Sequence, residues 1–203
     1  SGCARQNELT VANSTDISTL DPFGMFSRVE VGLGDHLYQS LTFFSPEMEI
    51  EPLLAESWER LEGDTTWTFH LRNDVRFHNG EVFDANAVKF SIETYYQRHK
   101  EGKTVGGASV ALPSAEIVRI DVLDPFTVNI TTNEPKALLP FYMSQLWMLA
   151  PDFYSTAEDA VRAENAVGTG AYVVENRVRD SHITLTANPD YWGPAPKTSR
   201  ITF

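Results

Sequence analysis

The chain of 203 residues contains a single cysteine, Cys3, so an internal disulfide is impossible. No segment approaches the roughly 20 consecutive apolar residues that a membrane-spanning helix needs. Basic residues are also scarce, because 16 Lys and Arg stand against 28 Asp and Glu and give a net charge of −12. Since nucleic-acid binding depends on basic patches, we expect no nucleic-acid partner. With 42% apolar residues, the chain is long enough for one large domain or two small ones.

Signatures of catalysis and of metal binding are equally scarce. The sequence has no Gly-x-Ser-x-Gly elbow, no phosphate-binding loop and no cysteine nucleophile with a partner. No two of its histidines have the i, i+4 spacing of a helical zinc site, the five being at positions 36, 70, 78, 99 and 182. We therefore expect a protein that is not an enzyme and that holds neither a cofactor nor a metal. A secreted hydrolase with an unrecognised carboxylate pair is the alternative.

Hydrophobic periodicity predicts both strands and helices. Alternating patterns predict strands over 8–12, 58–61, 67–71, 116–122, 127–131, 171–175, 183–187 and 201–203, with a hairpin over 42–52. Helical spacing predicts helices over 31–41, from the N-cap Asp84 to 100, after 135 and from 150. Residues 101–114 are rich in Gly, Lys, Ser and Thr and are predicted to form a mobile loop.

Several short motifs follow one another in a defined order. They are Leu54-Ala55-Glu56-Ser57-Trp58, Thr66-Trp67-Thr68-Phe69-His70-Leu71-Arg72, Val75-Arg76-Phe77-His78-Asn79-Gly80-Glu81-Val82-Phe83-Asp84-Ala85, Gly168-Thr169-Gly170-Ala171-Tyr172 and Asn188-Pro189-Asp190-Tyr191-Trp192-Gly193. This order resembles that of the family 5 extracellular solute-binding proteins, the peptide-, opine- and nickel-binding receptors of bacterial ABC importers. The chain departs from the family pattern at Ala171, where proline is usual.

The resemblance implies an α/β fold of the periplasmic-binding-protein type (class II, cluster C), in which two lobes enclose the ligand. Residues 1–43 and 168–203 would belong to the first lobe, and 44–167 would form an inserted α/β subdomain. Because family members are much longer, we expect an N-terminal portion whose second lobe lies after Phe203; a natural short protein is the alternative. One lobe supplies only half of the ligand contacts, so we expect these residues alone to bind ligand weakly or not at all.

In function, the resemblance implies a monomeric substrate-binding receptor that captures an oligopeptide or similar small solute and delivers it to the permease subunits of an ABC importer. A non-transport sensor or chaperone of the same fold is an alternative. We expect an exported protein, in the periplasm or on the outer face of the cytoplasmic membrane. Ser1-Gly2-Cys3-Ala4 looks like the end of a lipoprotein signal, which predicts a lipid anchor at Cys3 as the only membrane contact; an incidental cysteine is the alternative.

The loop over 23–30 contains four candidate ligand-binding residues. It follows the first predicted strand, and ligands of α/β sheets bind beyond the carboxyl ends of strands. Its mix of aromatic, thioether and charged side chains suits a pocket with apolar walls and a few orienting polar groups. In the peptide-binding relatives this loop faces the cleft, which makes Met25, Phe26, Arg28 and Glu30 candidates, with Glu30 at the place of a pocket glutamate. The alternative is a surface loop with an Arg28–Glu30 charge pair.

Trp147 is the remaining candidate. The segment 145–148 resembles the one in which a nickel-binding relative carries an arginine that holds an anionic metal chelate. Trp147 takes the place of that arginine, so a flat apolar group replaces a cation. This replacement argues against a negatively charged chelate held in the same manner and favours an oligopeptide or another amphipathic solute. The alternative is a tryptophan that belongs to the core.

Overall fold

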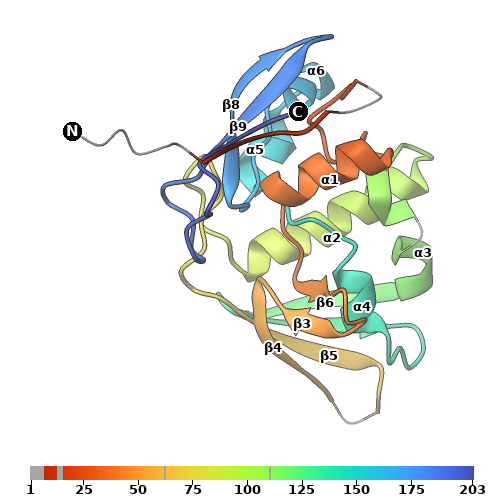
Figure 1. The fold of residues 1–203 in the computed structure, drawn as a ribbon. Coiled ribbons are helices and arrows are strands. Elements are labelled where there is room, and N and C mark those ends of the chain that lie inside the picture. Colours follow the sequence, from red (N-terminus) through yellow and green to blue (C-terminus); the bar gives the residue numbers. More distant parts are fainter. Residues whose placement is uncertain (1–6, 13–15, 62, 110) are drawn as a thin grey trace.

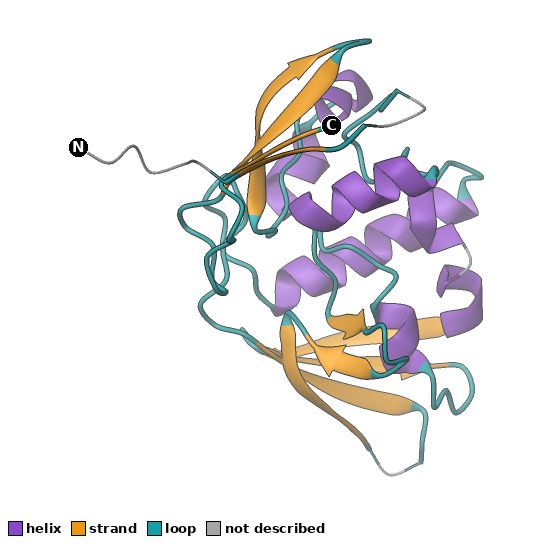
Figure 2. Cartoon of the chain, viewed as in Figure 1, coloured by secondary structure: helices purple, strands orange, loops and turns teal. Residues whose placement is uncertain are grey.

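The computed structural model describes residues 7–12, 16–61, 63–109 and 111–203. Cys3 lies outside the described residues, so its lipidation stays a prediction. Two groups of strands lie at opposite ends of the molecule, and the two longest helices run between them (Figures 1 and 2). These helices are α1 (Arg28–Leu37) and α2 (Ala85–Lys100).

The first sheet joins the beginning and the end of the chain. Its strand order is β1-β10-β9-β8, and its strands are β1 (Glu8–Thr10), β10 (Arg200–Thr202), β9 (His182–Ala187) and β8 (Tyr172–Val178). β10 lies parallel to β1, with Ile201 opposite Leu9, and antiparallel to β9. The predicted strand opening at 201–203 is therefore confirmed, and it has a partner on both sides. Helix α1 packs against β8.

The second sheet is antiparallel, with the order β4-β5-β7-β6. Its strands are β4 (Ala55–Arg60), β5 (Thr66–Leu71), β7 (Thr127–Thr132) and β6 (Ile117–Asp124). Alternation along the strands buries Phe69, Val128 and Ile130 on the face that α2 covers. The predicted N-cap is confirmed, because the Asp84 carboxylate accepts the backbone N–H of Ala87 at 2.9 Å.

Short elements connect the two sheets. They are the hairpin of β2 (Thr42–Phe44) and β3 (Ile50–Pro52) and the helices α4 (Leu139–Met143), α5 (Pro151–Thr156) and α6 (Asp159–Glu164). The strands of the first sheet lie within 1–43 and 168–203, and those of the second sheet lie within 44–167. Strand β2 crosses the boundary at 43/44, and the division of the chain at 43/44 and 167/168 stays a prediction.

The helix predicted over 31–41 is displaced toward the N-terminus. It begins at Arg28 because Ser27 and Glu30 form a capping box, in which each side chain binds the backbone N–H of the other residue. It ends at Leu37 because the next residues are extended, and Ser40 there forms a β-bridge with Trp147. Tertiary pairing has overridden the helical pattern at this end.

The prediction of a loop over 101–114 is wrong for the second half of this segment. Residues Gly106–Ser109 form a 3₁₀ turn (η1) and Ala111–Ala115 form the short helix α3, and Val105 and Leu112 are buried. Gly106 makes the packing possible, since its φ is +56° and a Cβ there would lie 2.1 Å from the carbonyl oxygen of Pro22. The small residues that suggested a loop instead allow close backbone approach.

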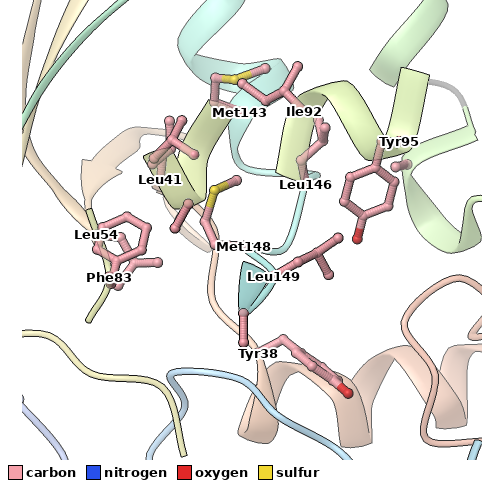
Figure 3. Close-up of a cluster of buried hydrophobic side chains, with 14 of the residues drawn as sticks. Tyr38, Leu41, Leu54, Phe83, Ile92, Tyr95, Met143, Leu146, Met148 and Leu149 are labelled. Carbon is pink, nitrogen blue, oxygen red and sulfur yellow. The ribbon is translucent and has the colours of Figure 1, made fainter. Parts of the chain in front are cut away.

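Buried side chains from all parts of the chain form one hydrophobic cluster. Figure 3 shows Leu146, Met148 and Leu149 in its middle, with Ile92 and Tyr95 of α2 to one side. The segment 145–150 is therefore held firmly against α2. This positions Trp147, which lies between buried neighbours in that segment.

Candidate ligand-binding site

A cavity with a volume of about 420 Å³ opens beside α1. It lies where α1, the strand β2, the end of α2, the turn η1 and the segment before α5 come together. Among the described residues it is lined by Pro22, Val31, Asp35, Tyr38, Gln39, Ser40, Phe43, Phe44, Leu53, Tyr95, Val105, Gly107, Ala108, Ser144, Gln145 and Trp147. Apolar and aromatic walls with a few polar groups are typical of small-molecule sites, and the volume is within their usual range of roughly 300–1,000 Å³.

Trp147 is both a wall of this cavity and a packed side chain. Its indole stacks on the Tyr38 ring, with 5.4 Å between the ring centroids and 25° between the planes. The far edge of the indole lies against Gly34, where a Cβ would be 2.3 Å from Trp147 Cη2. Glycine is therefore required at position 34 for this close approach. Trp147 is half-buried and lines the cavity, and its contact with a ligand stays a prediction.

Asp35 is the one formally charged side chain among the described residues of the lining. Trp147 donates its indole N–H to Asp35 Oδ1, with an N···O distance of 3.3 Å. Asp35 is exposed to solvent as a residue, yet partial burial of its carboxyl group raises its pKa above the usual value, and the hydrogen bond from Trp147 opposes that rise. Asp35 was not among the residues predicted from the sequence. A signal was available, because Val31, Asp35 and Tyr38 are spaced at i, i+4 and i+7 on one helix face.

The four candidates of the loop over 23–30 lie apart from this lining. Met25 is fully buried, with its sulfur 3.0 Å from the position of a Cβ on Gly34. Phe26 is 54% exposed, and Arg28 is exposed. In the described part of the chain, no ion pair joins Arg28 to Glu30. A contact of any of these residues with a ligand stays a prediction.

Glu30 is buried and holds the loop in place. Its carboxylate accepts the hydroxyl of Ser18 at 2.7 Å, together with the backbone N–H groups of Ser18, Phe26 and Ser27 at 3.0 to 3.3 Å. Burial by itself raises the pKa of Glu30, but the hydrogen bonds from Ser18, Ser27 and Phe26 more than offset it, so the pKa lies below its usual value. These bonds fix the chain that leads into α1, and so fix the helix that carries Asp35.

Two of the motifs recognised in the sequence meet on Gln39, which also lines the cavity. Gln39 Oε1 accepts the hydroxyl of Thr169 at 3.1 Å and the indole N–H of Trp192 at 2.9 Å. Its Nε2 donates to the hydroxyl of Tyr191 at 2.9 Å. The guanidinium of Arg72 lies 4.4 Å from the centre of the Trp192 ring. Sequence reasoning missed Gln39, and its neighbours in the chain provide no signal for this role.

His78, from a third motif, joins the loop between β5 and α2 to the Gly168-Thr169-Gly170 segment. Its Nδ1 accepts the backbone N–H of Gly168 at 3.3 Å, and its Nε2 lies 3.0 Å from the carbonyl oxygen of Gly170. The two contacts assign the proton to Nε2 in a neutral ring. Burial lowers the pKa of His78, although the bond to Gly170 works against this. His78 thus ties the loop that follows β5 to the segment that leads into β8.

Two searches of the described residues had negative results. No group of three or more His, Cys, Asp or Glu side chains there is arranged to hold a metal ion. In the same residues, no helix is both long enough and apolar enough to cross a membrane.

Comparison with known proteins gives consistent matches. Residues 49–203 match the family described as bacterial extracellular solute-binding proteins, family 5 Middle. The chain is 26% identical to the nickel-binding periplasmic protein of Escherichia coli K12 over 205 residues, covering 98% of this chain and 37% of the relative. It is 26% identical to the periplasmic oligopeptide-binding protein OppA of Haemophilus influenzae over 208 residues, covering 92% and 37%.

Among solved structures, the periplasmic binding protein DppA of Helicobacter pylori, in complex with the peptide STSA, has a TM-score of 0.84 and 29% identity. That match covers 96% of this chain and 42% of DppA. The chain therefore spans about two fifths of the length of such relatives, and the expected fold class, a first lobe of periplasmic-binding-protein type with an inserted subdomain, is confirmed. The chain belongs to the family 5 bacterial extracellular solute-binding proteins.

Proposed function

We propose that this chain is part of the substrate-binding receptor of a bacterial ABC importer and that the receptor captures an oligopeptide or a similar amphipathic small solute. The observation that carries the proposal is the 420 Å³ cavity, in which the aromatic side chains of Trp147, Phe43 and Phe44 stand beside the polar groups of Gln39 and Ser40. Such a wall can hold apolar parts of a solute while a few polar groups orient it. The relatives are named for binding peptides and nickel, which supports a binding role over catalysis.

In the proposed mechanism, the remainder of the full-length protein supplies a second lobe that closes over the cavity. A solute that contacts both lobes favours the closed population by its differential contacts. The closed receptor then delivers the solute to the permease subunits. We also propose that the protein lies outside the cytoplasmic membrane, as the periplasmic relatives do, and that a lipid anchor at Cys3 holds it there.

The loop candidates take part in this proposal at the edge of the cleft. Phe26 and Arg28 are exposed and available to a solute or to the second lobe. Met25 and Glu30 are buried, so we propose that they act by shaping the loop and the start of α1.

Isothermal titration of the full-length protein tests the proposal. The titrants are a pool of tri- to pentapeptides and, separately, the Ni²⁺–histidine chelate. Peptide binding that weakens at least several-fold in Trp147→Ala, and stays unchanged in the control Leu123→Ala, whose side chain is exposed on β6 and lies outside the cavity lining, supports the cavity as the site. Binding of the metal chelate with none of the peptides contradicts the proposed solute class.

Two further measurements separate the alternatives. Loss of solute uptake after deletion of the gene distinguishes an importer receptor from a sensor or chaperone, which would leave uptake intact. Turnover of a panel of chromogenic substrates would support a hydrolase instead. For the anchor, Cys3→Ala in the native precursor should release the protein from the membrane fraction, and unchanged fractionation would rule the anchor out.

A further inference from the structure

We propose that the cavity recognises a positively charged group of the solute, an ammonium or a guanidinium, by placing it against the carboxylate of Asp35, with the adjoining apolar part of the solute on the aromatic wall. This inference rests on the proposed function and names the solute class for the same site. It concerns a residue of α1 that neither the sequence motifs nor the family match singles out.

The charge of the cavity points to a cationic solute. Asp35 lines it, and no Lys, Arg or His of the described residues does. The other charged or ionisable groups of α1 lie elsewhere. Arg28 and Glu30 are outside the lining, and His36 packs on the first sheet, with its ring 5.5 Å from that of Tyr172. An anionic solute would meet a carboxylate here and no compensating cation, so the site discriminates against it.

The Asp35 carboxylate has unused capacity to accept hydrogen bonds. A carboxylate offers about four acceptor sites, and the indole N–H of Trp147 takes one of them on Oδ1. In the described part of the chain, the Asp35 carboxylate forms no ion pair and no other hydrogen bond. Because Asp35 is exposed, a cationic group of a solute can reach these acceptor sites and form charge-assisted hydrogen bonds with them.

The aromatic wall next to Asp35 is suited to the same ligand group. The indole that bonds to Asp35 is immobilised between Tyr38 and Gly34, and the faces of tryptophan rings attract cations. At the cavity mouth, Phe43 and Phe44 are 46% and 37% exposed, a large apolar area for a surface position. They can cover the apolar part of a solute, which makes the expected solute cationic and amphipathic.

The Phe44 ring is held in place from behind, because it packs edge-on against Phe141 with 5.2 Å between the ring centroids. The wall is therefore largely formed before any solute arrives, which lowers the entropic cost of binding. Because the aromatic wall and the carboxylate are both in place before binding, we expect the site to select solutes by where their positive charge lies, rather than by the identity of their other groups.

The test uses the full-length protein and a matched set of tripeptides, Ala-Xaa-Ala with Xaa as lysine, norleucine or glutamate, each with a free and with an acetylated amino terminus. Binding is measured by isothermal titration to wild type and to Asp35→Asn. The substitution removes the charge but keeps an oxygen that can accept the Trp147 N–H. Asp74→Asn is the matched control, because Asp74 is exposed and lies outside the cavity.

In wild type, we expect one cationic form, either the free terminus or the lysine side chain, to bind about tenfold more tightly than its neutral counterpart. Asp35→Asn should abolish that preference while affinity for the neutral peptide changes by less than about twofold, and Asp74→Asn should retain it. Tripeptide binding with the preference intact in Asp35→Asn would overturn this inference and leave the proposed function standing. Absence of binding by all tripeptides to wild type would overturn both.

Discussion

Gln39 accepts the indole N–H of Trp192 at 2.9 Å, although 153 residues separate them in the chain. The same side-chain oxygen accepts the hydroxyl of Thr169, which is completely buried. One amide at the end of α1 therefore ties two distant motifs to the wall of the cavity. The sequence motifs that identify the family are, at this point, contacts that hold the fold together.

Replacing Gln39 should therefore destabilise the protein strongly. Gln39→Ala leaves the Trp192 N–H and the hydroxyls of Thr169 and Tyr191 without their partner, and we expect a loss of about 2–4 kcal/mol in the free energy of unfolding. Urea unfolding of the full-length protein measures it. The control is Gln145→Ala, since the amide of Gln145 is exposed and, among the described residues, bonds only to Ser144; its cost should stay below about 0.5 kcal/mol. Equal losses for the two variants would contradict the assigned role of Gln39.

Gly34→Ala should displace Trp147. The added methyl group would lie 2.3 Å from the indole, which must move away from Tyr38. We expect a loss of about 1–3 kcal/mol in stability from this overpacking, together with weaker solute binding. The control is Gly32→Ala on the same helix, because no atom of the described residues lies within 4 Å of a Cβ there.

For Gly32→Ala, the better helix propensity of alanine should stabilise the protein by about 0.5–1 kcal/mol. Thermal unfolding and Trp fluorescence of both variants give the comparison. If Gly34→Ala were as stable as Gly32→Ala and bound the solute normally, the close contact with Trp147 would be wrong.

The stability of the protein should fall in mild acid through His78. Burial lowers the pKa of His78 in the folded state, whereas the unfolded chain keeps a value of about 6.5. The unfolded state therefore binds more protons, so the stabilisation is complete above about pH 6.5 and is lost as the pH falls below that value. His36 acts in the same direction, because burial also lowers its pKa.

Measuring the free energy of unfolding between pH 7.5 and 5 tests this. We expect His78→Gln to have a shallower decline than wild type, because the titrating group is gone. An NMR titration that placed the His78 pKa above 6.5 in the folded protein would contradict the neutral ring between Gly168 and Gly170.

Arg162, in the helix α6, should be required for stability. Its guanidinium Nε lies 3.1 Å from Asp21 Oδ2, and both side chains are only about one tenth exposed, at 9% and 11%. Arg162→Met leaves a buried carboxylate without its cation, which costs about 3–5 kcal/mol. Arg119→Met is the control, because its pair with Asp121 is exposed and worth less than about 1 kcal/mol.

The double variant Asp21→Asn with Arg162→Met should recover part of the loss, since no buried charge remains. Denaturant unfolding of the four proteins completes the cycle. Full additivity of the two single losses would show that Arg162 and Asp21 do not interact.

Local patterns in the sequence were sufficient for most of the secondary structure. The alternation around Phe69 and Val128 determines which faces of the second sheet are buried, and the Asp84 carboxylate determines where α2 begins. The ordered motifs were sufficient for the family. These features depend on residues that are close together in the sequence, so their spacing can be read from the sequence itself.

Only the tertiary structure decided how distant segments complete the site. Asp35 is positioned by a hydrogen bond from Trp147, 112 residues away. Helix α6 is held by the contact of Arg162 with Asp21, 141 residues away. The turn before Leu112 is ordered because Gly106 permits contact with Pro22, a reason that its composition alone cannot reveal. Such contacts depend on the packing of the whole chain, because each residue involved is compatible with many other neighbours until the fold brings one of them close.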